Sequence, residues 1–80
     1  MPIIFRYKEY RFFFYSNEGN PREPLHVHVR GNDGEAKFWL HPIVHLADSN
    51  GLDARALRVV TEAIEQNMAA IERAWNEHFC

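Results

Sequence analysis

The 80-residue sequence predicts a single α+β domain, in which a small antiparallel sheet of three to four strands precedes a short helix and a long C-terminal helix. Residues 1–41 contain short segments rich in Phe, Tyr, Ile and Val that are separated by turn residues, which is typical of strands. Residues 42–80 change to an apolar repeat of three to four residues, which is typical of a helix. A chain of this length is too short to bury two independent cores, so one domain is expected.

The sheet half is expected to contain hairpins and one longer loop. Lys8-Glu9 is expected to form the first turn, and Gly31-Asn32-Asp33-Gly34 has the composition of a hairpin turn. Proline, glycine and asparagine mark residues 17–24 as a loop. The expected strands are residues 3–7, 10–16, 25–30 and 36–40.

The helical half is expected to begin with a short helix at about residues 42–50, with Pro42 in its first turn and Gly51 as its stop. Asp53 can serve as the N-cap of the next helix. An unbroken helix over residues 54–79 would be about 39 Å long, whereas a compact domain of this size is ~30 Å across. The helix is therefore expected either to bend near Gln66-Asn67 or to project and find a partner.

Alternation along the strands divides the sheet into two faces. One face is almost purely apolar and is expected to pack on the helices: Phe12, Phe14, Val27, Val29, Ala36, Phe38 and Leu40. The other mixes aromatic, cationic and imidazole groups: Arg11, Phe13, Tyr15, His26, His28, Arg30, Lys37, Trp39 and His41. Such a face is too apolar for an ordinary solvent-exposed surface and too charged for a hydrophobic core. Either a helix, the 17–24 loop or a second copy of the chain covers it, or it binds a partner, with aromatic rings stacking on bases and cations meeting phosphates.

The composition and charge of the chain bear on its cellular location and on the ligands it can bind. Cys80 is the only cysteine in the sequence, so no internal disulfide is expected and the cytoplasm is the simplest location. Neither a secretory signal nor an apolar run long enough to span a membrane is recognisable. The net charge of −2 argues against a strongly basic nucleic-acid binder.

His26 and His28 are two residues apart on an expected strand, so their imidazoles point the same way. They could share a divalent transition metal, and a catalytic zinc site would need a third protein ligand. His41, His45 and Asp48 are the candidates, although nothing in the spacing forces them to converge on the pair.

The same two histidines could instead act as general acid and general base in RNA cleavage without a metal. Arg11 or Arg30 would then contact the phosphate. Cys80 suggests only a free terminal thiol.

Residues 43–60 have the pattern of a helix-turn-helix, with Gly51 at the turn and Arg55 and Arg58 directed at a groove. Acidic residues such as Asp48 and Asp53 would lie near the phosphates. A helical corner used only for packing is therefore favoured over DNA binding.

Four segments resemble a known family: residues 10–20 (YRFFFYSNEGN), 24–29 (PLHVHV), 35–40 (EAKFWL) and 74–79 (AWNEHF). Over nearly its whole length the chain is similar to the small bacterial proteins of domain-of-unknown-function family 4160. The family pattern has Pro-Pro where this chain has Pro24-Leu25, and usually an acid at the position of His41, which weakens His41 as a metal ligand. The resemblance implies a stand-alone protein, often encoded beside another small domain in an arrangement similar to a toxin-antitoxin module, and supplies no activity.

The sequence thus favours a non-catalytic interaction protein of a toxin-antitoxin-like pair, which binds a protein or RNA partner through the His/Arg/aromatic face. It is expected to self-associate as a homodimer through Ile71, Trp75 and Phe79. The alternatives are an RNase-like toxin or metal-dependent enzyme that uses His26 and His28, and a DNA-binding regulator that uses residues 43–60.

Overall fold

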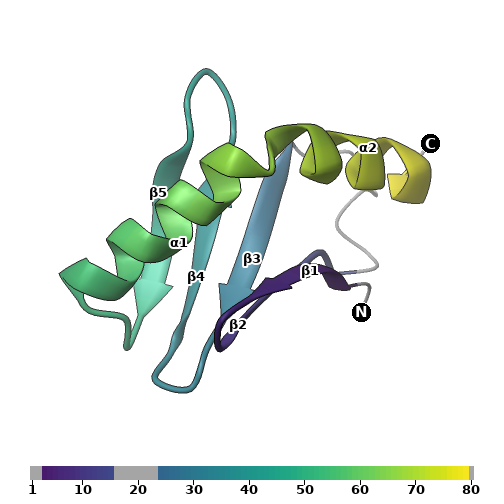
Figure 1. Ribbon diagram of the computed structural model, residues 1–80. Helices are drawn as coiled ribbons and strands as arrows, with labels where there is room; N and C mark the ends of the chain where they lie inside the picture. Colours follow the sequence, from purple (N-terminus) through teal and green to yellow (C-terminus); the bar gives the residue numbers. More distant parts are fainter. Residues whose placement is uncertain (1–2, 16–23, 80) are drawn as a thin grey trace.

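The computed structural model describes residues 3–15 and 24–79. Its elements are β1 (Ile3–Tyr7), β2 (Tyr10–Phe13), β3 (His26–Arg30), β4 (Glu35–Trp39), β5 (His45–Asn50), α1 (Ala54–Gln66) and α2 (Met68–Phe79). The strands form one sheet in sequence order, with every neighbouring pair antiparallel, and the helices cover one of its faces (Figure 1). The α+β class is confirmed, but the sheet has five strands rather than three to four. The expected 17–24 loop, apart from Pro24, and Cys80 lie outside the described residues.

Both expected turns are present in the sheet. Lys8 adopts a positive φ of 54° in the first turn. In the second, the Gly31 N–H donates to the Gly34 carbonyl at 2.9 Å. Glycine is required at position 34 because a Cβ there would collide with the backbone of Asn50 and Gly51.

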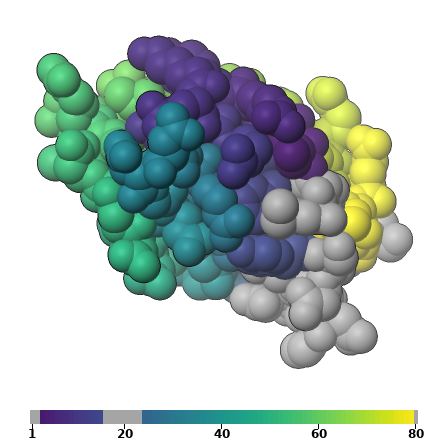
Figure 2. All heavy atoms as spheres, turned by 90° about the horizontal axis from the view of Figure 1, so that it is seen from below, coloured from purple at the N-terminus to yellow at the C-terminus, as the bar shows by residue number. Residues whose placement is uncertain are grey.

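The connections at this end of the sheet lie side by side. The Asn32 N–H donates to Glu9 Oε2 at 3.2 Å, which joins the β3–β4 turn to the β1–β2 turn. Figure 2 views the molecule from this end, with the N-terminal hairpin in purple, the β3–β4 turn in blue and the segment around the start of α1 in green.

The expected short helix at residues 42–50 is wrong, because His45–Asn50 form β5 on the outer edge of β4. Pro42 lies in the preceding turn, after a cis peptide bond. The pairing satisfies the outward backbone groups of β4, whose Ala36 and Phe38 side chains are buried in the core, and that requirement outweighs the weak strand propensity of Ala, Asp and Asn. The helix-turn-helix and the helical corner at residues 43–60 are both wrong for the same reason.

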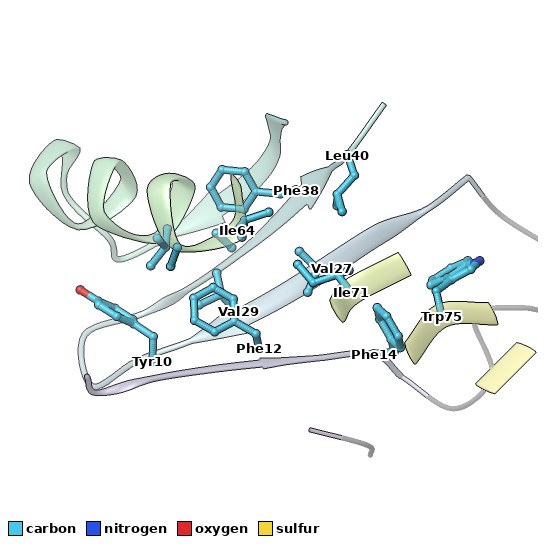
Figure 3. Packing of buried hydrophobic residues seen from close by; sticks show 13 residues of the cluster. Tyr10, Phe12, Phe14, Val27, Val29, Phe38, Leu40, Ile64, Ile71 and Trp75 are labelled. Carbon is cyan, nitrogen blue, oxygen red and sulfur yellow. The ribbon is translucent and has the colours of Figure 1, made fainter. Parts of the chain in front are cut away.

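The core lies between the sheet and the helices, and its composition confirms the predicted apolar face (Figure 3). Every residue predicted for that face is at most 6% exposed. The helices contribute Val60, Ala63, Ile64, Ile71 and Trp75.

The helical segment bends at Asn67, as the length of the segment suggested. The Asn67 N–H donates to the Ile64 carbonyl at 3.0 Å, and its side-chain Nδ2 donates to the Ala63 carbonyl at 2.7 Å. These bonds satisfy carbonyls that the end of α1 would leave without an intrahelical donor. At the other end of α1, Asp53 is confirmed as the N-cap, because its Oδ1 accepts from the Ala56 N–H at 2.8 Å.

The bend turns α2 so that Ile71 and Trp75 reach the core, where they are 0% and 5% exposed. Self-association through Ile71, Trp75 and Phe79 stays a prediction, and it would require the Ile71 and Trp75 side chains to leave the core. Within residues 3–15 and 24–79, neither helix has the length and hydropathy to cross a membrane.

Candidate binding face

The sheet face opposite the helices, which we call the open face, has a defined order of side chains. Cross-strand neighbours project from the same face, so the register arranges them in rows. The first row contains Phe13, His28, Lys37 and Asp48; the second contains Arg11, Arg30, Glu35 and Asn50; the third contains His26, Trp39 and His45. The structure therefore places the predicted residues of β2, β3 and β4 on one face.

An aromatic cluster occupies the β2–β3 side of the open face. The Phe13 ring is 5.7 Å from the His28 ring and 5.3 Å from the Tyr15 ring, and Tyr15 and His28 are 4.6 Å apart. The Arg30 guanidinium lies 5.9 Å from the centre of the Phe13 ring. Phe13 is only 1% exposed, whereas Tyr15, His28 and Arg30 are half-buried. The accessible part of the cluster is thus amphipathic.

His26 differs from His28 in its surroundings. The two imidazole rings are 5.2 Å apart, so they lie close together on one face, as their spacing on one strand predicted. His26, however, is 0% exposed, and its ring lies 5.4 Å from Trp39 and 5.2 Å from Trp75. Its Nδ1 donates to the Pro24 carbonyl at 2.9 Å. His26 is therefore built into the packing at the end of the sheet, while His28 stays at the surface.

A groove of about 290 Å³ crosses the open face toward β5. Its charged lining groups include Lys37 together with Glu35 and Asp48. The Lys37 ammonium lies 4.4 Å from the centre of the Trp39 ring, a cation–π distance. The groove is lined by Tyr15, His28, Glu35, Ala36, Lys37, Asp48, Ser49 and Asn50.

Arg30 and Glu35 form an ion pair beside the groove, with Nη2 and Oε2 3.0 Å apart. The hydrogen bond to Glu35, and next its negative charge, raise the pKa of Arg30 above its ordinary value. The Arg30 and Glu35 side chains keep 42% and 49% of their surface exposed, so solvent screens the pair and it contributes little to stability. Its main effect is to set an acidic group beside the arginine.

Three residues were candidates for a third metal ligand: His41, His45 and Asp48. Among the described residues, none of them forms a ligand group with His26 and His28. His41 was expected on the open face, but β4 ends at Trp39, and His41 Nε2 lies 3.9 Å from Glu72 Oε1 of α2 on the helical side. The His45 Nδ1 donates to the Ile43 carbonyl at 2.7 Å. In residues 3–15 and 24–79, no three His, Cys, Asp or Glu side chains are grouped to hold one ion.

Sequence reasoning missed Glu35, Ser49 and Asn50 as groove residues, and it considered Asp48 only as a metal ligand and as an acidic residue that opposes DNA binding. The cause is the wrong assignment of residues 42–50 as a helix. One signal was available, since Asn50-Gly51 is as typical of a turn after a strand as of a helix end.

The fold and the open face define a class of small α+β protein, in which helices shield one side of an antiparallel sheet and the other side carries a mixed polar and aromatic groove. The model of the family described as Domain of unknown function (DUF4160) matches residues 10–76, and the chain belongs to this family. The match includes His26, His28 and all of β5. Neither the curated proteins nor the solved structures gave a match.

Proposed function

We propose that this chain is a bacterial, non-catalytic interaction protein that binds a small protein partner through the groove of the open face. The partner would be encoded beside it, in an arrangement like a toxin-antitoxin module. The observation that carries the proposal is the lining of the groove, where Tyr15 and His28 adjoin charges of both signs. Aromatic residues and arginine are enriched at protein interfaces, and Arg30 lies beside the groove through its ion pair with the lining residue Glu35.

The charges of the groove favour a protein over RNA. Lys37 shares the lining with Glu35 and Asp48, and Arg30 is paired with Glu35. Carboxylates repel a phosphate backbone, whose neutralisation by cations supplies most of the affinity for nucleic acids. A protein surface can match charges of both signs, which gives specificity and orientation.

The burial of the aromatic rings supports the same choice. Binding single-stranded RNA needs exposed rings on which bases can stack. Phe13 is 1% exposed, and Tyr15 and Trp39 are half-buried against His28 and His26. Partly covered rings suit the shallow contact of a protein side chain better than they suit base stacking.

The enzyme alternative with His26 and His28 as acid and base is less well supported. A substrate in the groove would meet His28, but His26 is 0% exposed and does not line the groove. The alternative is tested by RNA cleavage with His28→Ala. Cleavage by the wild type that His28→Ala abolishes, at an unchanged thermal midpoint, would support the enzyme and contradict our proposal.

The binding proposal is tested by co-expressing the chain with the protein encoded beside it and measuring how much of that protein co-purifies with the chain. We expect Trp39→Ala and Arg30→Ala to reduce the amount of partner that is recovered. Arg58→Ala, which changes an exposed residue of α1, should leave this amount unchanged. Equal recovery with all three variants would overturn the assignment of the open face. A single-stranded RNA oligonucleotide, followed by fluorescence anisotropy, should show no binding that Arg30→Ala weakens.

A further inference from the structure

We infer that β5 is a self-association strand, through which two copies of the chain pair antiparallel about a two-fold axis and join their sheets. β5 is an outer strand of the sheet, and all six of its residues are exposed (Figure 1). On an outer strand every second residue directs its N–H and C=O away from the sheet, which is a template for another strand. Leu46 within β5 and Ile43 just before it are 43% and 71% exposed.

The irregularity in β5 determines which side chains would meet in such a pairing. Lys37 pairs with Asp48 and Phe38 pairs with Leu46, so Ala47 is an extra residue that forms a bulge. Without the bulge, His45 and Asp48 would point to opposite faces, because they are three residues apart. With it, both point to the open face.

A two-fold axis through the bulge brings His45 of each copy opposite Asp48 of the other. Such an interface is self-complementary, because each copy contributes the same patch and both contacts form twice. The neighbouring registers would oppose His45 to its own copy or Asp48 to its own copy. Charge complementarity therefore selects one register and one occupant, a second copy of this chain.

The hydrogen bonding of His45 fits this contact. Its Nδ1 donates to the Ile43 carbonyl at 2.7 Å, so the protonated ring presents Nε2–H to a carboxylate. Within its own chain, the charged groups in the adjoining row of the open face are Lys37 and Asp48.

The opposite edge of the sheet lacks this complementarity. β1 carries Arg6 and is followed by Lys8, both exposed, and it contacts α2. Cations on an edge strand oppose pairing with another copy. The inference is thus specific to β5. It shares Asp48 with the lining of the groove proposed for a protein partner, but it is argued from the edge of β5 alone and its test measures only self-association.

The experiment is sedimentation equilibrium of the chain from ~10 μM to ~1 mM. A six-residue strand pairing buries less than the lower limit of about 1,200 Å² for a standard interface, so we expect a weak dimer. The buffer contains a reductant, to keep Cys80 from linking chains, and is held near pH ~5.5, where imidazoles are largely protonated. We expect the wild type to form dimers within this range.

Three variants test the register. His45→Asp opposes carboxylates at both ends of the pairing and should weaken the dimer roughly tenfold or more. The exchange His45→Asp with Asp48→His should restore it. His41→Asp, the same substitution in an exposed turn, should have no effect.

Amide hydrogen exchange of the wild type gives a second readout that needs no variant, because β5 amides should become more protected as concentration rises. A wild type that stays monomeric at ~1 mM, with β5 exchange independent of concentration, would overturn the inference. A dimer that His45→Asp leaves intact, or that the exchange variant fails to restore, would also overturn it.

Discussion

The imidazole ring of His26 lies 5.2 Å from the indole ring of Trp75, although one belongs to the open face of the sheet and the other to a helix on the opposite side. Trp75 also packs edge-on to Phe14, with ring centres 5.0 Å apart. The indole therefore closes the end of the sheet, where β3 begins. This position explains why two histidines of one strand, with the same direction, have unequal exposure.

The unequal exposure predicts unequal effects on stability. His26→Ala should lower the free energy of unfolding by about 2–3 kcal/mol, because it removes a fully buried ring and leaves a cavity beside Trp39 and Trp75. His28→Ala removes a half-buried ring and should cost less than about 1 kcal/mol. Urea unfolding of both variants measures the difference, and equal losses would show that His26 is not a packing residue.

The contact between the β3–β4 turn and the end of β5 predicts a strict requirement for glycine. Gly34→Ala should destabilise the protein by about 2 kcal/mol or more, because the added methyl group collides with backbone that cannot rotate away. Asn32→Ala, in the same turn, should be nearly neutral because the bond to Glu9 uses the Asn32 backbone. Thermal unfolding distinguishes the two, and a stable Gly34→Ala variant would contradict the described packing of β5.

Tyr10 predicts a loss of stability at alkaline pH. Burial, and then the negative charges of Glu9, Asp53 and Asp33, raise the pKa of Tyr10 above 10.0. Because the folded state holds the phenol proton more tightly than the unfolded state, this contribution is complete below pH ~10 and is lost as the pH rises through the folded-state pKa.

Tyr10→Phe should therefore flatten the decline in unfolding free energy above pH ~10, as measured by urea unfolding at several pH values. Tyr7→Phe, at an exposed position, is the control. A decline that is equally steep in Tyr10→Phe and the wild type would contradict the predicted effect of burial.

The sheet and its faces were predictable because alternation in the strands reports directly on burial. Phe12, Val27 and Phe38 are core residues by parity alone, and each is at most 1% exposed. The bend at Asn67 was one of two outcomes allowed by helix length. These features depend on local pattern and on the size of the domain.

The outer strand was not predictable in the same way. Residues 45–50 have no buried side to impose an alternating pattern, since all six are exposed, and their pairing is determined by β4. The groove was missed with them, because Asp48, Ser49 and Asn50 form its outer wall. The burial of His26 was also missed, since it arises from Trp75, which is distant in sequence.

The most direct test of the proposed groove is isothermal titration of the chain with the purified neighbouring protein, comparing Lys37→Glu with Arg58→Glu. Both variants replace a cation by a carboxylate, but Lys37 lines the groove and Arg58 is exposed on α1. We predict that Lys37→Glu weakens binding about tenfold or more and that Arg58→Glu leaves it unchanged. Equal affinity of Lys37→Glu and the wild type would contradict binding through the open face.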